Sequence, residues 1–248
     1  MIGILYFSST GNSLFIANKI QTKIGGQIIY IPNYVGSGNE YEKIIIVTPI
    51  YSFGMPVHVY NLLPKLDKSK EIIVVLNYGG MTGGADYYIY EYALKNGLNI
   101  KSVFTIKMPE NYTLTLSMPK LYLKKVLNSA DKRTDAVVKK IAKGQYVVPS
   151  KKKTKEKTYL KNKANWHIIG RRFSIKDNCI KCGKCINICP VKNITMENSK
   201  IVFGDSCIAC LGCYHRCPQK AIVYLNKRKK DRYINPFINE DLIGKDIK

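Results

Sequence analysis

The sequence predicts an α/β fold with a doubly wound, five-stranded parallel sheet, followed by a small cysteine-rich α+β domain. Two observations carry this prediction. Over residues 1–146, apolar runs typical of buried strands alternate with segments of helical periodicity. All eight cysteines then fall between residues 179 and 217. The 248 residues leave room for one medium domain and one small one.

The expected strands are short, mostly apolar and bounded by glycine, proline or polar residues. They cover Ile2–Phe7, Gln27–Ile31, Lys43–Pro49, Glu71–Asn77 and Ile100–Lys107. Apolar side chains at helical spacing, with proline near the starts and glycine near the ends, predict the helices between and after them. These helices cover Gly11–Ile24, Pro56 towards Leu66, a segment that ends at Asn96–Gly97, and Pro119–Lys143.

Composition divides the chain into four parts, which are a domain of residues 1–146, a basic linker 147–170, a cysteine-rich domain 171–226 and a basic tail 227–248. The first part has 17 Lys and Arg against 9 Asp and Glu, whereas residues 147–248 have 23 against 8. Trp166 is the only large anchor expected in the linker. The tail, with its basic run Lys227–Lys230, is assigned no structure.

The eight cysteines form two runs, each with the spacing C-x2-C-x2-C-x3-C-P, and the second run repeats the first at one constant interval along the chain. This is the bacterial spacing for two 4Fe–4S clusters, in which the fourth cysteine of each run serves the other cluster. On that rule the ligand sets are Cys179, Cys182, Cys185 and Cys217 for one cluster, and Cys207, Cys210, Cys213 and Cys189 for the other.

Two other uses of the cysteines fit less well. A disulfide framework needs an oxidising compartment, and because Met1 leads directly into the first strand we expect no signal peptide and a cytoplasmic location. Zinc sites favour two Cys pairs with a longer spacer. His215 fills an x position of the second run and is expected to cover a cluster rather than to ligate it.

A second site follows the first strand, where small hydroxyl side chains and a glycine precede a helix. Backbone N–H groups at such a helix N-terminus form a cradle for an anion. The loop lacks the Gly-Lys-Ser/Thr of a P-loop and the glycine pattern of a dinucleotide fingerprint. It consists of Ser8, Ser9, Thr10, Gly11, Asn12 and Ser13.

This loop resembles the flavodoxin phosphate loop, Thr/Ser-x-Thr-Gly-Asn-Thr/Ser, which binds the phosphate of FMN without arginine or lysine. Two further loops are similar to the flavin-binding loops of that family, and Tyr51 falls at the position of the aromatic ring that lies on the flavin. The resemblance implies that FMN also contacts Pro49, Ser52, Phe53, Gly54, Asn77, Tyr78, Gly79, Gly80 and Gly84.

The chain departs from the flavodoxin pattern at two glycines. Gly80 stands where an acidic residue is common, and Gly84 stands where many flavodoxins have a second stacking tyrosine. Tyr78, Tyr87 and Tyr88 are candidates to compensate. We hypothesise that Gly84 leaves one flavin face bare, so that the cysteine-rich domain can dock there.

Taken together, the chain resembles flavodoxin–ferredoxin fusions, a family of anaerobe proteins that join an FMN domain to a two-cluster 4Fe–4S ferredoxin. Residues 1–112 and 171–226 carry the resemblance, and Met108–Tyr112 also looks typical of the fusion, at the flavin edge or the domain seam. It implies an electron carrier that couples the one-electron clusters to FMN, which exchanges one electron or two.

Two alternatives remain open, and partners are expected only in general terms. One is a flavin-dependent reductase in which the clusters feed electrons to FMN and a small oxidised molecule is the acceptor. The other is a nucleic-acid-binding redox sensor, based only on Lys151–Lys157 and Lys227–Lys230, which are more often solvated faces. We expect redox partner proteins with acidic docking surfaces and, because no apolar run approaches about 20 residues, no membrane span. The sequence leaves the oligomeric state open.

Overall fold

Five parallel strands form the sheet of the first part of the chain in the computed structural model, which describes residues 1–114, 117–225 and 231–247. The strand order is β2-β1-β3-β4-β5, and every neighbouring pair is parallel. This is the flavodoxin-like order, which places a ligand site beyond the carboxyl ends of β1 and β3. The strands are β1 (Ile2–Tyr6), β2 (Gln27–Tyr30), β3 (Lys43–Pro49), β4 (Glu71–Tyr78) and β5 (Ile100–Lys107).

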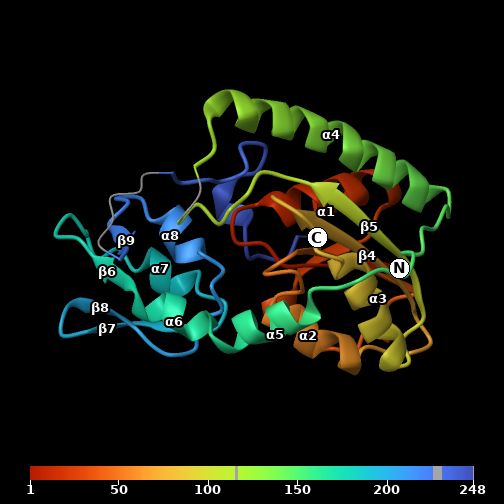
Figure 1. The fold of residues 1–248 in the computed structure, drawn as a ribbon, viewed down its shortest axis with the longest axis horizontal. Coiled ribbons are helices and arrows are strands. Elements are labelled where there is room, and N and C mark those ends of the chain that lie inside the picture. The colour runs from red at the N-terminus through yellow and green to blue at the C-terminus, as the bar shows by residue number, and fades with distance from the viewer. Residues whose placement is uncertain (115–116, 226–230, 248) are drawn as a thin grey trace.

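Helices cover both faces of this sheet, with α1 and α4 on one side and α2 and α3 on the other (Figure 1). The apolar runs Ile44–Val47 of β3 and Ile72–Leu76 of β4 are buried, as a strand between two helical layers requires. The expected elements are confirmed, and a 3-10 turn continues the helix that begins after Pro56. The helices are α1 (Asn12–Ile24), α2 (Val57–Leu62), α3 (Ala85–Lys95) and α4 (Lys120–Ala142), with 3-10 turns at Ile31–Asn33 and Leu63–Lys65.

The segment expected as a basic linker contains two helices, α5 (Glu156–Ala164) and α6 (Trp166–Arg171). Trp166 is buried as an anchor, but it is not the only one, because Tyr159 is fully buried and its hydroxyl donates a hydrogen bond to the Met55 carbonyl at 2.9 Å. Some of the basic side chains also contact the first part of the chain, since Lys152 pairs with Asp86 at 2.7 Å. The connector is therefore packed, and we call residues 147–171 the connector below.

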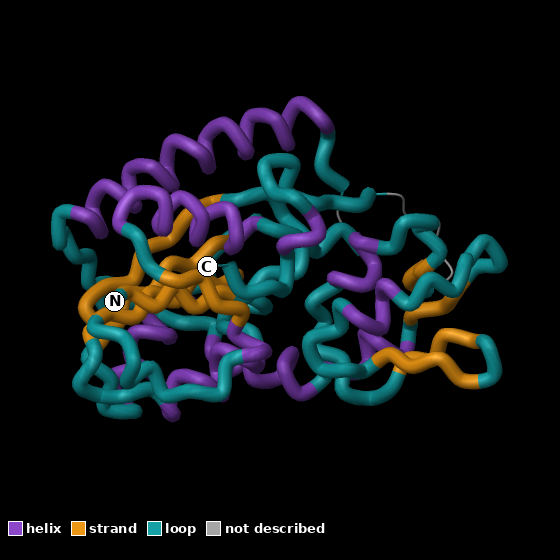
Figure 2. The backbone as a smooth tube through the Cα atoms, turned by 180° about the vertical axis from the view of Figure 1, so that it is seen from behind, coloured by secondary structure: helices purple, strands orange, loops and turns teal. Residues whose placement is uncertain are grey.

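The cysteine-rich segment is small and α+β, with its own apolar core, and it lies beside the sheet domain (Figure 2). Strands β6 (Phe173–Ile175) and β9 (Ile222–Tyr224) pair antiparallel, as do β7 (Ile194–Glu197) and β8 (Lys200–Phe203). Two short helices, α7 (Lys184–Asn187) and α8 (Gly212–Arg216), each contain the third cysteine of one run. Leu114 of the first part of the chain joins this core.

The described part of the tail, residues 231–247, returns to the flavodoxin-like domain. Ile247 pairs antiparallel with Ile28 at the edge of β2, and Ile243, just after a 3-10 turn at Glu240–Leu242, is buried. The basic run Lys227–Lys230 lies outside the described residues. The tail thus extends the sheet domain at a place where the sequence predicts no structure.

Among the described residues, none of the helices combines the length and the apolar character that crossing a bilayer demands.

Candidate flavin and iron–sulfur sites

The loop of residues 8–13 joins β1 to α1 at the carboxyl end of the sheet, where the strand order reverses. Its polar side chains are buried, and Ser8 Oγ accepts a hydrogen bond from the Gly11 N–H at 3.0 Å. Gly11 has a φ of 92°, which favours glycine, and a Cβ there would come within 3.2 Å of Asn235 Cβ in the tail. The loop therefore presents hydroxyl and backbone N–H groups at a helix N-terminus without a basic side chain.

A narrow cavity opens directly above this loop. It is lined by five of the six predicted phosphate-loop residues together with Pro49, Asn77, Tyr78 and Gly79. Asn77 Nδ2 donates to Ser13 Oγ at 2.7 Å, which ties the ends of β4 and α1 together across the cavity floor. Gly11 is the one residue of the six that does not line this cavity. Its positive φ instead forms the turn that leads into α1.

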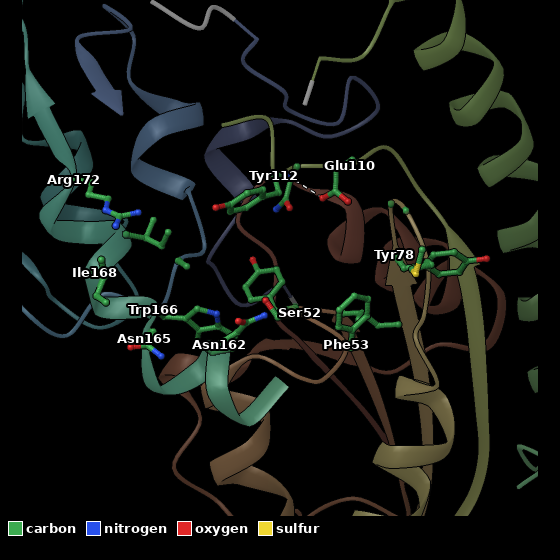
Figure 3. A pocket seen from close by; sticks show the side chains of 18 residues that line it. Ser52, Phe53, Tyr78, Glu110, Tyr112, Asn162, Asn165, Trp166, Ile168 and Arg172 are labelled. Carbon is green, nitrogen blue, oxygen red and sulfur yellow. Dashed lines mark hydrogen bonds between the residues drawn. The ribbon is translucent and has the colours of Figure 1, made fainter. Parts of the chain in front are cut away.

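A larger cavity of about 580 Å³ shares Tyr78, Gly79 and Asn111 with the narrow one and reaches the cysteine-rich segment. Figure 3 shows Tyr78 at one end and Arg172 at the other, with Trp166, Ser52 and Phe53 between them. Three sources line it: the loops after β3, β4 and β5, the connector helices, and the loop between two cysteines. The lining residues are Ile50, Tyr51, Ser52, Phe53, Tyr78, Gly79, Gly80, Met81, Glu110, Asn111, Tyr112, Asn162, Asn165, Trp166, Ile168, Ile169, Arg172 and Ala209.

The loop after β3 holds its aromatic residues in a strained turn. Ser52 and Phe53 have φ values of 49° and 74°, and the backbones of Tyr51 and Gly54 bond across the turn. Non-glycine residues in this region cost of order 1–3 kcal/mol each and cluster at functional sites. The Lys155 ammonium lies 4.5 Å from the Phe53 ring centroid, so the connector helps to hold the turn.

Tyr51 is buried and contacts both neighbouring parts of the site. Its hydroxyl lies 3.2 Å from Ser9 Oγ in the phosphate loop, and its ring is perpendicular to the Trp166 indole with centroids 6.2 Å apart. Burial raises the pKa of Tyr51, which keeps the hydroxyl protonated. Tyr51, the residue predicted to lie on the flavin ring, thus contacts both the loop of residues 8–13 and the connector.

Two predicted flavin-contact glycines lie outside both cavities and have packing roles. A Cβ at Gly54 would lie 2.4 Å from the Tyr159 ring, and one at Gly84 would lie 2.7 Å from the Lys153 carbonyl oxygen. Gly84 also has a φ of 80° as the residue before α3. The connector, and not the cysteine-rich segment, covers Gly84, which corrects the hypothesis of a docking face there.

His215 joins the flavin-side loops to the cysteine-rich segment. Its Nδ1 accepts from the Tyr233 N–H at 3.1 Å, so its Nε2 carries the proton and donates to the Asn111 carbonyl at 2.7 Å. Burial lowers the pKa of His215 to about 4. With both nitrogens engaged, the imidazole fastens α8 to the loop after β5 and to the tail.

Two further cavities divide the eight cysteines between them. One is lined by Cys189, Cys207, Cys210 and Cys213, and we call these the proximal set. The other is lined by Cys179, Cys182, Cys185 and Cys217, and we call these the distal set. Each cavity thus combines three cysteines of one run with the fourth of the other, which is the grouping that the crossed rule predicts.

The backbone around the two sets repeats at the same interval as the cysteines. Lys181 and Ala209 have φ values of 55° and 56°, and Lys192 and Lys220 both have 50°. Backbone N–H groups point at three cysteine sulfurs, from Asn193 to Cys189 (3.2 Å), from Ala209 to Cys207 (3.4 Å) and from Ala221 to Cys217 (3.3 Å). Such bonds stabilise negative charge on sulfur.

The proximal set lies against the flavin-side loops. Ala209, between Cys207 and Cys210, lines the large cavity, and a Cβ at Gly212 would lie 3.6 Å from Ser9 Cβ and 3.8 Å from Cys210 Sγ. Helix α6 touches the same loop, because a Cβ at Gly170 would lie 2.6 Å from Cys207 Cβ. Only this half of the repeat contacts the large cavity.

The two sets also differ in exposure. Burial raises the pKa of the Cys210 thiol to about 12 and that of Cys213 well above its usual value, whereas Cys182 is exposed. A thiolate at Cys210 therefore requires a compensating cation, which is what iron supplies in a cluster. The donor chemistry of the proximal cavity fits an iron–sulfur cluster.

Sequence reasoning missed the connector's part in the site. Asn162, Asn165, Ile168 and Ile169 line the large cavity but belong to a stretch that reads as lysine-rich linker. The available signal was Tyr159 and Trp166, two large aromatic residues seven positions apart and so on one face of a helix. Residues 108–112, expected at the flavin edge or the seam, include Asn111, which lines the large cavity and whose carbonyl accepts a hydrogen bond from His215 of the cysteine-rich segment.

Comparisons with known proteins give one family match and several similar solved structures. Residues 178–222 match the family model of the 4Fe-4S dicluster domain. Comparison with the curated proteins finds no match. Similar solved structures include a flavodoxin from Megasphaera elsdenii, with 18% identity over 56% of this chain and 99% of the flavodoxin and a TM-score of 0.38.

Two further structures are similar at the same level. A flavoprotein from Lactobacillus acidophilus, solved in complex with FMN, has 18% identity over 42% of this chain and 91% of its own, with a TM-score of 0.37. The Trp repressor binding protein from Bacillus subtilis has 14% identity over 56% and 96%, with a TM-score of 0.40. The fold assignment rests on the strand order, and with the dicluster match it gives the chain the architecture of a flavodoxin–ferredoxin fusion.

Proposed function

We propose that the chain is an electron-transfer iron–sulfur flavoprotein, with FMN in the joined cavities and one 4Fe–4S cluster on each cysteine set. The observation that carries this proposal is the large cavity, which is bounded on one side by the flavodoxin-type loops and on the other by Ala209, between two cysteines of the proximal set. On this proposal residues 1–146 bind FMN, residues 147–170 are the linker, residues 171–226 bind the clusters, and residues 227–248 are the tail.

The residues present fit both kinds of cofactor. The narrow cavity offers Ser8, Ser9, Thr10 and Ser13 at a helix N-terminus for a phosphate, and the large cavity lies within the roughly 300–1,000 Å³ that is usual for cofactor sites. Each cysteine cavity offers four thiols and an apolar lining. These donor sets support FMN and two clusters.

FMN exchanges one electron or two, and each cluster carries one, so together they link two-electron and one-electron carriers. The protein's own part is to hold the three sites in a row. Gly170 permits close packing of α6 at the proximal set, and His215 fixes the loop after β5 against α8. Electrons would thus pass between FMN and the distal set through the proximal set.

Anaerobic purification with iron, sulfide and flavin quantitation tests this function. About eight irons and one FMN per chain are expected, the iron count following from two four-iron clusters. A redox titration should then resolve flavin and cluster transitions separately. Bound zinc in place of iron, or a flavin-free protein that takes up no FMN, would overturn the proposal.

A second candidate, a flavin-dependent reductase, is favoured by the polar end of the large cavity. Arg172 lies at the end opposite Tyr78, Asn162 and Asn165 line the cavity between them, and these three side chains could bind a small polar acceptor (Figure 3). A screen for substrate-dependent reoxidation of the dithionite-reduced protein separates the two functions, because a carrier should show no small-molecule turnover above the autoxidation rate.

A further inference from the structure

The loops that surround the two cysteine sets have the same shape but opposite surroundings. Ile208 and Ala209 pack against the flavodoxin-like domain and the large cavity. Their counterparts in the first run are Ile180 and Lys181. Ile180 is 60% exposed, whereas Ile208 is 6% exposed. One half of the repeat thus has an interface inside the chain, and the equivalent surface of the other half faces outward.

The likeness of the two surfaces is a matter of backbone conformation as well as sequence. Lys181 and Ala209 share the same left-handed conformation, and Gly183 and Leu211 repeat it with φ values of 71° and 61°. Helices α7 and α8 begin at equivalent positions of the two runs, at Lys184 and Gly212. The outward surface at Ile180 therefore copies the shape of one that packs beside a cofactor cavity.

The chemistry around the outward surface differs from that around the inward one. Lys176, Lys181 and Lys220 are exposed around it, and the segments that carry them are paired, since the Lys176 N–H donates to the Ala221 carbonyl at 3.0 Å. Asp177 is the one exposed acid in the same two segments, residues 176–182 and 218–220. Exposed Cys182 of the distal set lies two positions after Ile180 in the first of these segments.

We propose that this surface, defined by Lys176, Ile180, Lys181 and Lys220, is the docking site of a separate redox protein whose cofactor edge is ringed by acidic residues. The inference rests on the proposed function, because the distal set must hold a cluster for docking to pass an electron. Ile180 supplies the apolar centre of the interface, and the lysines attract the acidic partner and orient it as it approaches. Two other cations close in sequence to the cysteines, Lys184 and Arg216, are engaged with Glu240 of the tail and do not belong to this surface.

Binding of an acidic [2Fe–2S] ferredoxin to the full-length holoprotein is the test, measured by calorimetry at low and high salt. The variants are Ile180→Glu and the double reversal Lys176→Glu/Lys220→Glu. Lys139→Glu/Lys140→Glu is the matched control, with the same change of charge on the exposed last turn of α4. We expect the double reversal and Ile180→Glu each to weaken binding about tenfold or more, and the control to weaken it less than about twofold.

Several outcomes would overturn the docking site: no binding by the ferredoxin, equal weakening in the control, or competition by duplex DNA at the same ionic strength. Iron and FMN contents, measured on every variant, keep this test separate from the proposed function. Normal contents with unchanged binding would defeat the docking site alone. Contents other than about eight irons and one FMN would defeat the proposed function. The binding comparison would then still show whether the ferredoxin binds the surface defined by Lys176, Ile180, Lys181 and Lys220.

Discussion

The two halves of the cysteine repeat share spacing and backbone conformation, but of the two only the second half lines the large cavity. Its loop contacts the phosphate loop through Gly212, helix α6 through Cys207, and the loop after β5 through His215. The first half keeps Cys182 and Ile180 exposed. The difference teaches that two segments with the same spacing and backbone conformation can have different surroundings, and in the proposed function those surroundings separate the site next to FMN from the site that faces outward.

The largest expected effect comes from removing one partly buried ligand and one exposed ligand. Cys210→Ser and Cys182→Ser occupy equivalent positions, each at the second cysteine of its run. Each should lower the iron content from about eight to about four per chain, because each belongs to one four-iron site. Only Cys210→Ser should abolish electron exchange between FMN and the remaining cluster. Iron analysis and rapid-mixing absorbance measure the two results, and equal transfer in both variants would contradict the proximal–distal order.

Close packing of α6 on the second half should be the next most sensitive feature. Gly170→Ala places a Cβ 2.6 Å from Cys207 Cβ, so α6 must move away. Overpacking of this kind costs about 1–3 kcal/mol in the free energy of unfolding. Urea unfolding measures it, and Ala164→Val, at an exposed position of the neighbouring helix α5, serves as the control. Equal stability of the two variants would show that α6 does not depend on contact with Cys207.

His215 and its counterpart Asn187 make a third comparison, since each lies two positions after the third cysteine of its run. His215→Leu leaves the Asn111 carbonyl and the Tyr233 N–H without their partner in a buried site. An unsatisfied buried group costs about 1–3 kcal/mol, so we expect a loss of about 2 kcal/mol or more. Asn187→Leu, on an exposed site, should stay within about 0.5 kcal/mol of the wild type in the same denaturation experiment.

The smallest expected effect concerns the tail, which contacts both the second half and the phosphate loop. Tyr233→Phe removes the hydrogen bond from the hydroxyl to Asn12 Oδ1 at 2.6 Å. We expect a cost of about 1 kcal/mol and a several-fold weaker FMN affinity, measured by flavin fluorescence. Tyr122→Phe, at an exposed position on α4, is the control and should leave the affinity unchanged.

Much of the fold could be predicted because the strands and helices of the first part of the chain have strong local signals. The runs Ile44–Val47 and Ile72–Leu76 leave no alternative to buried strands, and Gly11 and Asn96–Gly97 mark helix ends. Helix α5 could not be predicted in the same way, because its many lysines make the segment polar and Tyr159 alone does not form an apolar stripe at helical spacing. Its stability comes from packing that aromatic side chain onto the first part of the chain, which is a tertiary contact.

By itself, the sequence determined the strand and helix order and the equivalence of the two cysteine runs, because spacing and periodicity are local properties of the chain. Only the tertiary structure decided that the two cysteine runs have different surroundings and different exposure to solvent. Ala209 and Lys181 have the same conformation, and their surroundings come from α6, the loop after β5 and the tail, all distant in sequence. Burial depends on what packs against a residue, and that is set by contacts across the whole fold.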